Sequence, residues 1–290
     1  MASTFTAGKR LHQALKQEQP LQVAGTINAY TALLAEHAGL RALYLSGSGV
    51  STASCGVPDL GITNLNDVLE DTRRITNTTS LPLLVDIDTG FGNALGIARA
   101  IKAMIQAGAA GVHIEDQESS KRCGHRPGKK IVSVAEMCDR LKAAADAKTD
   151  ASFVLMARTD ALGNESLEQT LERAQRYIEA GAEMLFLEGA RNLTDYERAA
   201  QTCKVPVLAN ITEFGVTPLF TREELAKAGV NLILYPLSAF RAMNAAALQV
   251  YRSLRTEGTQ QSVLPLMQTR EELYEILHYY DYEKKFTGVI

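Results

Sequence analysis

Eight short apolar runs, each followed by a segment with helical signals, constrain the fold of this chain more than any other feature. The runs are continuous rather than alternating, which is typical of parallel strands that are buried on both faces. They occupy residues 21–27, 42–47, 81–88, 110–116, 153–159, 183–189, 205–212 and 231–237. A repeated strand–helix unit predicts a parallel α/β fold, and eight units predict one (β/α)8 TIM-type barrel domain over residues 1–290. An open doubly wound sheet is the alternative.

The segments between the runs carry signals for where helices begin and end. Ser133, Ser166 and Thr221 each stand three residues before a Glu or Gln, which is the capping-box pattern of a helix start. Ala-Gly pairs stand just before four of the strands, where glycine can adopt the left-handed conformation that ends a helix. These pairs are at residues 38–39, 107–108, 180–181 and 228–229.

The chain continues beyond the eighth unit. We expect a long helix from about residue 238 to residue 255, then a break, and then one final tyrosine-rich helix. Tyr274 and Leu277 fall on one face of that helix, so the C-terminal helices, about residues 238–290, are expected to pack on something.

Composition narrows the class of protein. The 290 residues carry a net charge of −3 and are 46% hydrophobic, which favours neither nucleic acid nor an anionic membrane as a partner. No apolar run reaches the ~18 residues of a membrane span, and the first twenty residues lack the apolar core of a signal peptide. The cysteines show no Cys-x-x-Cys spacing, so we expect a reduced compartment, the cytoplasm or an organelle matrix. They are Cys55, Cys123, Cys138 and Cys203.

Polar residues gather after the predicted strands, at the end where barrel enzymes carry their active sites. Acidic side chains there are costly unless they are paired or bind a metal. Asp86 and Asp88 are two apart on one predicted strand, so both carboxylates can point toward the barrel mouth. With Glu115 on the next strand they predict a site for Mg²⁺ or Mn²⁺, because those cations prefer oxygen ligands. The other polar strand-end residues are Ser46, Gly47, Ser48, Asp116, Gln117, Arg158, Thr159, Asp160, Glu188, Asn210 and Thr212.

Three arginines could bind the carboxylates of an anionic substrate. Arg158 follows the fifth strand and predicts a bidentate clamp, although it could instead pair with one of the acids. Arg241 and Arg270, in the C-terminal part, could act in the same way or form surface ion pairs.

A basic loop, SSKRCGHRPGKK at 119–130, places Cys123 and His125 among lysines and arginines. It has no apolar face to bury, so it is either a solvated surface loop or a mobile element that handles something negatively charged.

Several motifs resemble the isocitrate lyase/phosphoenolpyruvate mutase superfamily. They are KRCGH at 121–125, VDIDTGFGN after the third strand, HIEDQ after the fourth and ARTDA after the fifth. KRCGH resembles the lyase branch in particular, and the likeness runs nearly end to end. Two departures stand out: Ser48 replaces a usual glycine, and Phe186-Leu-Glu-Gly189 replaces a usual FPEA.

The resemblance implies a barrel whose eighth helix swaps onto a partner, generally within a homotetramer, and a Mg²⁺ cofactor with Mn²⁺ possible. It implies Asp86 and Asp88 as metal ligands, with Glu115 reaching the metal through water. The substrate contacts that it implies are Ser46, Gly47, Ser48, Cys123, Gly124, Arg158, Glu188, Asn210, Ile211, Thr212, Arg241 and Arg270.

The implied reaction cleaves a small tricarboxylate, (2S,3R)-2-methylisocitrate, into pyruvate and succinate in the methylcitrate cycle of propionate catabolism. The alternative is cleavage of isocitrate or of another 2-hydroxy acid used by the same superfamily. Phe186 and Leu234 favour 2-methylisocitrate over isocitrate, because larger aromatics usually stand there in isocitrate-preferring members. Cys123 would be the general acid, its thiolate favoured by Lys121, Arg122 and His125.

The basic loop would then be a lid over the substrate. Tyr44 is the candidate base, although packing explains it equally well.

Two other classes of function compete. A Schiff-base aldolase needs a lysine buried at a strand end, whereas every lysine here is expected on a helix or in a loop. A non-catalytic binding barrel would not need the metal acids, the general acid and the carboxylate clamps together.

Overall fold

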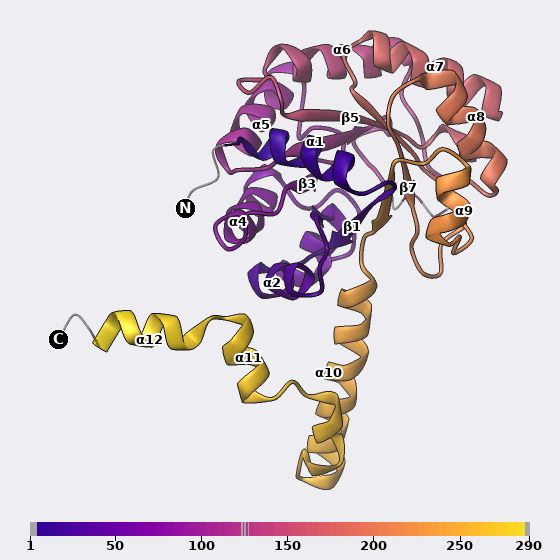
Figure 1. Ribbon diagram of the computed structural model, residues 1–290. Helices are drawn as coiled ribbons and strands as arrows, with labels where there is room; N and C mark the ends of the chain where they lie inside the picture. Colours follow the sequence, from indigo (N-terminus) through magenta and orange to yellow (C-terminus); the bar gives the residue numbers. More distant parts are fainter. Residues whose placement is uncertain (1–4, 123, 125, 127, 288–290) are drawn as a thin grey trace.

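Eight parallel strands form one closed barrel in the computed structural model, which describes residues 5–122, 124, 126 and 128–287 (Figure 1). Strands that follow one another in sequence pair with each other, and β1 pairs with β8. The predicted barrel is therefore confirmed and the open sheet is wrong. The strands are β1 (Leu21–Gly25), β2 (Ala42–Leu45), β3 (Leu83–Asp86), β4 (Gly111–Glu115), β5 (Val154–Thr159), β6 (Met184–Leu187), β7 (Val207–Asn210) and β8 (Leu232–Tyr235).

The barrel interior is packed with side chains and closed at its amino-terminal end. Inward-facing residues such as Val23 and Met156 form one buried cluster, and Leu11 and Ala14 of helix α1 (Ala7–Gln17) belong to the same cluster. A Cβ on Gly8 would lie 2.1 Å from the Ser152 carbonyl oxygen, so only glycine lets α1 lie this close. The other end of the barrel is left for polar residues.

Helices cover the outside of the barrel as the local signals predict. The glycine of each Ala-Gly pair has a φ between 80° and 114°, the left-handed conformation that ends a helix. Ser166 and Thr221 form full capping boxes, whereas Ser133 forms half of one, since Glu136 pairs with Arg140 at 2.7 Å. The helices are α2 (Ala29–His37), α3 (Gly47–Gly49), α4 (Leu65–Thr76), α5 (Ala94–Gln106), α6 (Val134–Asp146), α7 (Leu167–Glu179), α8 (Leu193–Cys203) and α9 (Arg222–Lys227), with a π-helical turn η1 (Val50–Ser54) and a 3₁₀ turn η2 (Ala161–Gly163).

A C-terminal arm extends away from the barrel (Figure 1). It consists of α10 (Ser238–Glu257), the 3₁₀ turn η3 (Gln261–Leu266), α11 (Arg270–Ile276) and α12 (Tyr279–Thr287). The prediction of one final helix is wrong, because the chain turns at His278 with a φ of 52°. The arm returns to touch the barrel at α2, where the Tyr30 hydroxyl donates to Gln268 Oε1 at 2.7 Å.

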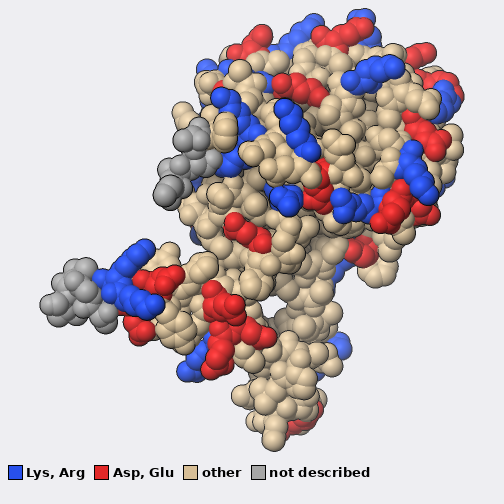
Figure 2. Space-filling view, viewed as in Figure 1, with Lys and Arg blue, Asp and Glu red and all other residues tan. Residues whose placement is uncertain are grey.

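Most of the arm surface is uncovered, and large apolar side chains lie on it. Ser253 is the one buried residue of the twenty in α10, and Figure 2 shows that the tip of the arm is mostly free of charged side chains. Large apolar side chains that are exposed on the arm include Met243, Leu248, Tyr251, Leu254, Leu264, Leu266, Tyr280, Tyr282 and Phe286. The prediction that these helices pack on something outside the chain is compatible with this surface.

Within the described ranges, no helix is long and apolar enough to cross a membrane.

Candidate active site

A cavity of about 220 Å³ opens at the carboxyl ends of the strands. Tyr44, Phe186 and Pro236 are among the side chains that line it, but its charges are what distinguish it. Five lining residues are basic and five are acidic, so the described lining is balanced in formal charge. They are Lys121, Arg122, Arg126, Arg158, Arg241, Asp59, Asp86, Glu115, Glu188 and Glu213.

Asp86 and Asp88 converge beside Gly47. Asp86 ends β3, and its carboxylate accepts hydrogen bonds from the Gly47 and Asp88 backbone amides, both at 3.0 Å. Asp88 lies beyond the strand with a φ of 49°, so the prediction of two carboxylates on one strand face is wrong in its backbone geometry. A Cβ on Gly47 would lie 2.9 Å from Asp88 Oδ1 and 3.1 Å from Asp86 Oδ2. The two carboxylates do converge as predicted, but a turn at Asp88 brings them together and not a continuous strand.

Lys121 is the positively charged partner of these acids, and the sequence did not predict this pairing. Its ammonium lies 2.6 Å from Asp59 Oδ1 and 2.5 Å from Asp88 Oδ1. Burial and the neighbouring Asp86 carboxylate nevertheless raise the pKa of Asp88 to about 7, which reports how crowded the negative charge is. Cys123 lies outside the described residues, so the prediction that Lys121 favours a thiolate there stays a prediction.

The lysine also bears on the aldolase alternative. Burial of Lys121 opposes its charge, but Asp88 and Glu115 outweigh burial and raise its pKa above the ordinary value. A Schiff base needs a neutral amine, so a lysine held as an ammonium is a poor nucleophile.

The acids of the mouth suit a hard divalent cation. Glu115 Oε1 is buried without a hydrogen-bond partner among the residues described, while Oε2 lies 3.2 Å from Arg158. No three Asp, Glu, His or Cys side chains in the described ranges converge closely enough to hold a metal alone. Mg²⁺ usually binds one or two carboxylates and keeps several waters, so Asp86 and Asp88, with Glu115 through water, fit such an ion.

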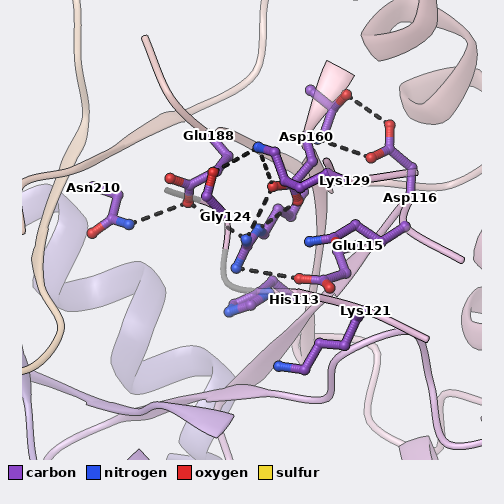
Figure 3. Close-up of polar contacts among 12 residues, drawn as sticks. His113, Glu115, Asp116, Lys121, Gly124, Lys129, Asp160, Glu188 and Asn210 are labelled. Atoms are coloured by element: carbon purple, nitrogen blue, oxygen red, sulfur yellow. Dashed lines mark hydrogen bonds and ion pairs between the residues drawn. The ribbon is translucent and has the colours of Figure 1, made fainter. Parts of the chain in front are cut away.

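Arg158 lies among three carboxylates at the end of β5. Figure 3 labels the three acids, Glu115, Asp160 and Glu188. Its guanidinium is 3.2 Å from Glu115, 3.0 Å from Asp160 and 3.7 Å from Glu188, and it stands 5.1 Å from the centre of the Phe186 ring. Arg158 therefore pairs with acids and also lines the cavity. These acids fix the orientation of its guanidinium, which suits binding of a substrate carboxylate.

Tyr44 is both a packing residue and a member of a polar group. Its hydroxyl lies 2.9 Å from His113 Nε2 and 3.4 Å from Asp86 Oδ2. Burial, and then the charge of Asp86, raise the pKa of Tyr44 well above its ordinary value, while burial lowers the pKa of His113 to about 4. A phenol that keeps its proton is better suited to donate a hydrogen bond to a developing oxyanion than to act as the base.

The described part of the basic loop is not simply solvated. Gly124 is buried, and a Cβ there would lie 2.4 Å from an Arg158 nitrogen and 2.7 Å from Glu188 Cγ. Gln117 accepts from the Arg122 amide at 3.0 Å and donates to its carbonyl at 2.9 Å. Arg122 therefore lies at the mouth, as predicted, whereas Cys123 and His125 lie outside the described residues.

The other predicted substrate contacts divide into three groups. Ser46, Ser48, Thr212 and Arg241 line the cavity, as does Asn210, which donates to Glu188 Oε2 at 3.2 Å. The Ile211 side chain packs into the core between barrel and helices, so it could offer only its main chain to a ligand.

Arg270 begins α11 in the arm and is not among the lining residues of this chain's cavity. Arg241 forms an ion pair with Glu213 at 3.6 Å and also lines the cavity. The two alternatives stated for Arg241 therefore do not exclude each other.

The two departures from the family pattern leave the site intact. Ser48 lines the cavity beside Ser46. Glu188 follows β6 directly, its amide donates to the Thr159 carbonyl at 3.1 Å, and Gly189 adopts a φ of 78°. The Glu188 carboxylate is therefore held at the mouth.

Four site residues were missed or left without a role by the sequence: Asp59, His113, Lys129 and Asp160. Each acts on a residue distant in sequence, as when Lys129 Nζ lies 2.8 Å from Asp160 Oδ1. Only the polar character of Asp160 at a strand end was a local signal.

Comparison with known proteins agrees with this geometry. Residues 11–255 match the family model of phosphoenolpyruvate phosphomutase. A 2-methylisocitrate lyase of Escherichia coli (strain K12) is 62% identical over 99% of this chain and 97% of its own length.

Solved structures with the same fold include 2,3-dimethylmalate lyase, with a TM-score of 0.91, 30% identity and coverage of 99% of this chain and 96% of that one. Phosphonopyruvate hydrolase in complex with oxalate and Mg²⁺ has a TM-score of 0.84 and 28% identity, covering 97% and 98%. With its barrel, its mouth acids and these relatives, the chain belongs to the phosphoenolpyruvate mutase/isocitrate lyase superfamily.

Proposed function

We propose that this chain cleaves 2-methylisocitrate into pyruvate and succinate. The observation that carries the proposal is the 62% identity, over nearly the whole chain, to a protein named 2-methylisocitrate lyase. The mouth supports it, because Asp86, Arg158 and Glu188 line one small cavity at the end of the barrel where such chemistry takes place.

The charge of the mouth fits a polyanionic substrate together with a divalent cation. The described lining is already balanced in charge, so three substrate carboxylates would need additional positive charge. A Mg²⁺ ion, held by Asp86 and Asp88 with Glu115 through water, would supply that charge next to the C2 hydroxyl and its carboxylate. Mn²⁺ could take the same place. Arg158 would bind another carboxylate, and Arg241 would contribute from the rim.

The reaction moves two protons, and this chain would supply one of them. The C2 hydroxyl gives its proton to water as the C2–C3 bond breaks, which yields pyruvate and leaves the electron pair on C3 of the succinate fragment. Tyr44 would donate a hydrogen bond to the oxygen on C2. Cys123, which follows Arg122 in the chain, would protonate C3 as the general acid, with His125 supporting the thiolate afterwards.

Specificity for the methyl group would come from the barrel interior. Phe186 and Leu234 belong to the same buried cluster, and Phe186 also lines the cavity. A side chain larger than leucine at position 234 would reduce the room in that cluster beside the cavity. A preference of one methyl group is worth about 1–3 kcal/mol, so some turnover of isocitrate is expected.

The arm supports a homo-oligomeric assembly. Its exposed apolar side chains, such as Leu248 and Tyr251, resemble a surface that is buried against another copy, and a homotetramer with swapped helices is our proposal. The enzyme would work in the cytoplasm on a soluble substrate.

A substrate panel tests the proposed activity. We expect kcat/KM to be highest for 2-methylisocitrate, lower for isocitrate and lowest for 2,3-dimethylmalate, in buffer that contains Mg²⁺. Equal or better turnover of either alternative would contradict the assignment of the substrate.

A further inference from the structure

We propose that Lys129 is a positioning residue, which holds the main chain at Gly124 over Arg158 through the same carboxylate that orients Arg158. Lys129 Nζ donates to the Gly124 carbonyl at 2.7 Å and to Asp160 Oδ1 at 2.8 Å, and Figure 3 shows both contacts. The side chain is only 7% exposed. The inference deepens the proposed function and rests on it for its catalytic consequence.

Asp160 is a rigid acceptor shared by two cations. Its carboxylate accepts from Arg158 Nε at 3.0 Å and Nη2 at 3.2 Å, and it is fully buried. The Asp116 carboxylate accepts a hydrogen bond from the Asp160 backbone amide at 2.8 Å and so fixes Asp160. It also accepts hydrogen bonds from the Thr159 and Tyr177 hydroxyls at 2.7 and 2.9 Å. Because this carboxylate is fixed, it holds the Lys129 ammonium and the Arg158 guanidinium in a defined position relative to each other.

The main chain at Gly124 lies directly against two charged side chains. A Cβ on Gly124 would lie 2.4 Å from Arg158 Nη2 and 2.7 Å from Glu188 Cγ, so only glycine fits there. Gln117 holds Arg122 on the other side of the loop by two hydrogen bonds. In sequence, the proposed general acid, Cys123, stands between these two held residues.

Lys129 also leaves Arg158 available to a substrate. Arg158 faces three carboxylates, and the ammonium of Lys129 offsets the charge of one of them, Asp160. Without that ammonium the site would be more negative by one unit, and the loop would lose its contact with the end of β5. We therefore expect the loss to appear mainly in kcat, since Asp160 would still orient Arg158.

The test compares Lys129→Met with Lys130→Met, a change of the exposed lysine next in sequence. Hydrogen–deuterium exchange of peptides spanning 118–131 is measured without substrate, and kcat and KM with 2-methylisocitrate. Lys129→Met should speed exchange in the loop roughly tenfold and lower kcat by roughly 10- to 100-fold, as expected for a lost charged hydrogen bond. KM should change by no more than a few-fold.

Lys130→Met should match the wild type, and Lys129→Arg should recover part of kcat because a guanidinium can still donate to both acceptors. If Lys129→Met is unstable, Lys129→Gln serves the same comparison.

Loop exchange and kcat equal to those of Lys130→Met would overturn the inference. The exchange measurement needs no turnover, so it is distinct from failure of the proposed function, which would appear as a wild-type enzyme without activity on 2-methylisocitrate.

Discussion

The barrel mouth and the C-terminal arm differ in whether their side chains find partners within the chain. At the mouth, buried charged groups such as Arg158 and Lys121 find their partners within the chain, at 2.5–3.7 Å. On the arm, apolar side chains remain exposed, as with Leu248 at 49% and Tyr251 at 68%. The described charges of the mouth are therefore paired within the barrel, whereas the apolar surface of the arm is what the proposed assembly would bury.

This contrast predicts that substitutions can impair activity and assembly separately. Changes at the mouth should remove activity and leave the assembly intact, whereas changes on the arm should alter the assembly first.

The largest effect is expected for Asp88→Ala. This change removes one of the two converging carboxylates that the proposed metal needs, so kcat should fall by roughly 1,000-fold or more. The melting temperature should stay near that of the wild type, because burial and the Asp86 carboxylate, which raise the pKa of Asp88 to about 7, oppose its charge, and Lys121 keeps Asp59 as a partner. Asp146→Ala, on an exposed helix end, is the matched control and should keep full activity. Near-normal turnover by the Asp88 variant would remove it from the site.

Cys123→Ser should lower kcat by roughly 100-fold or more, the usual contribution of a general acid. Serine is nearly isosteric, so binding of substrate, measured by calorimetry, should be retained. Cys55→Ser is the control, since Cys55 is an exposed cysteine of the same chain. If the Cys123 variant keeps its kcat, another residue delivers the proton.

On the arm, Leu248→Asp should lower the molar mass that light scattering reports. Burial of a leucine in an interface contributes about 1.5–3 kcal/mol, and a carboxylate there would oppose association. Leu95→Asp changes an 80% exposed leucine on α5 and should leave the mass unchanged. An unchanged mass for the Leu248 variant as well would show that this face of α10 is not an interface.

The smallest effect concerns specificity. Leu234→Phe should narrow the preference for 2-methylisocitrate over isocitrate by about 1–3 kcal/mol, which is the range for one methyl group. The ratio of the two kcat/KM values measures it. If the preference for 2-methylisocitrate stays the same or increases in this variant, the substrate methyl group does not lie beside Leu234.

The sequence predicted what local signals determine. Glycine at residues 39, 108, 181 and 229 ends a helix because of its own backbone freedom, and continuous apolar runs form strands because both of their faces are buried. Pairing between distant residues has no such signal. Nothing near Lys121 in sequence indicates that Asp59 and Asp88 will surround it, and nothing near Lys129 indicates Asp160.

The arm shows the same limit in another form. One face on one final helix was predicted, but the turn at His278 that divides it into two helices was not, because its backbone conformation has no counterpart in the apolar pattern. Local periodicity indicates that a face is apolar, but it does not indicate what that face packs on.

The central claim is most directly tested by following the products of one reaction. Purified protein is mixed with 2-methylisocitrate, once with Mg²⁺ and once with EDTA, and both mixtures are followed by NMR. We predict equal amounts of pyruvate and succinate with Mg²⁺, none with EDTA, and recovery when excess Mg²⁺ is added back. No pyruvate from 2-methylisocitrate in any of these conditions, or full turnover in EDTA, would contradict the account.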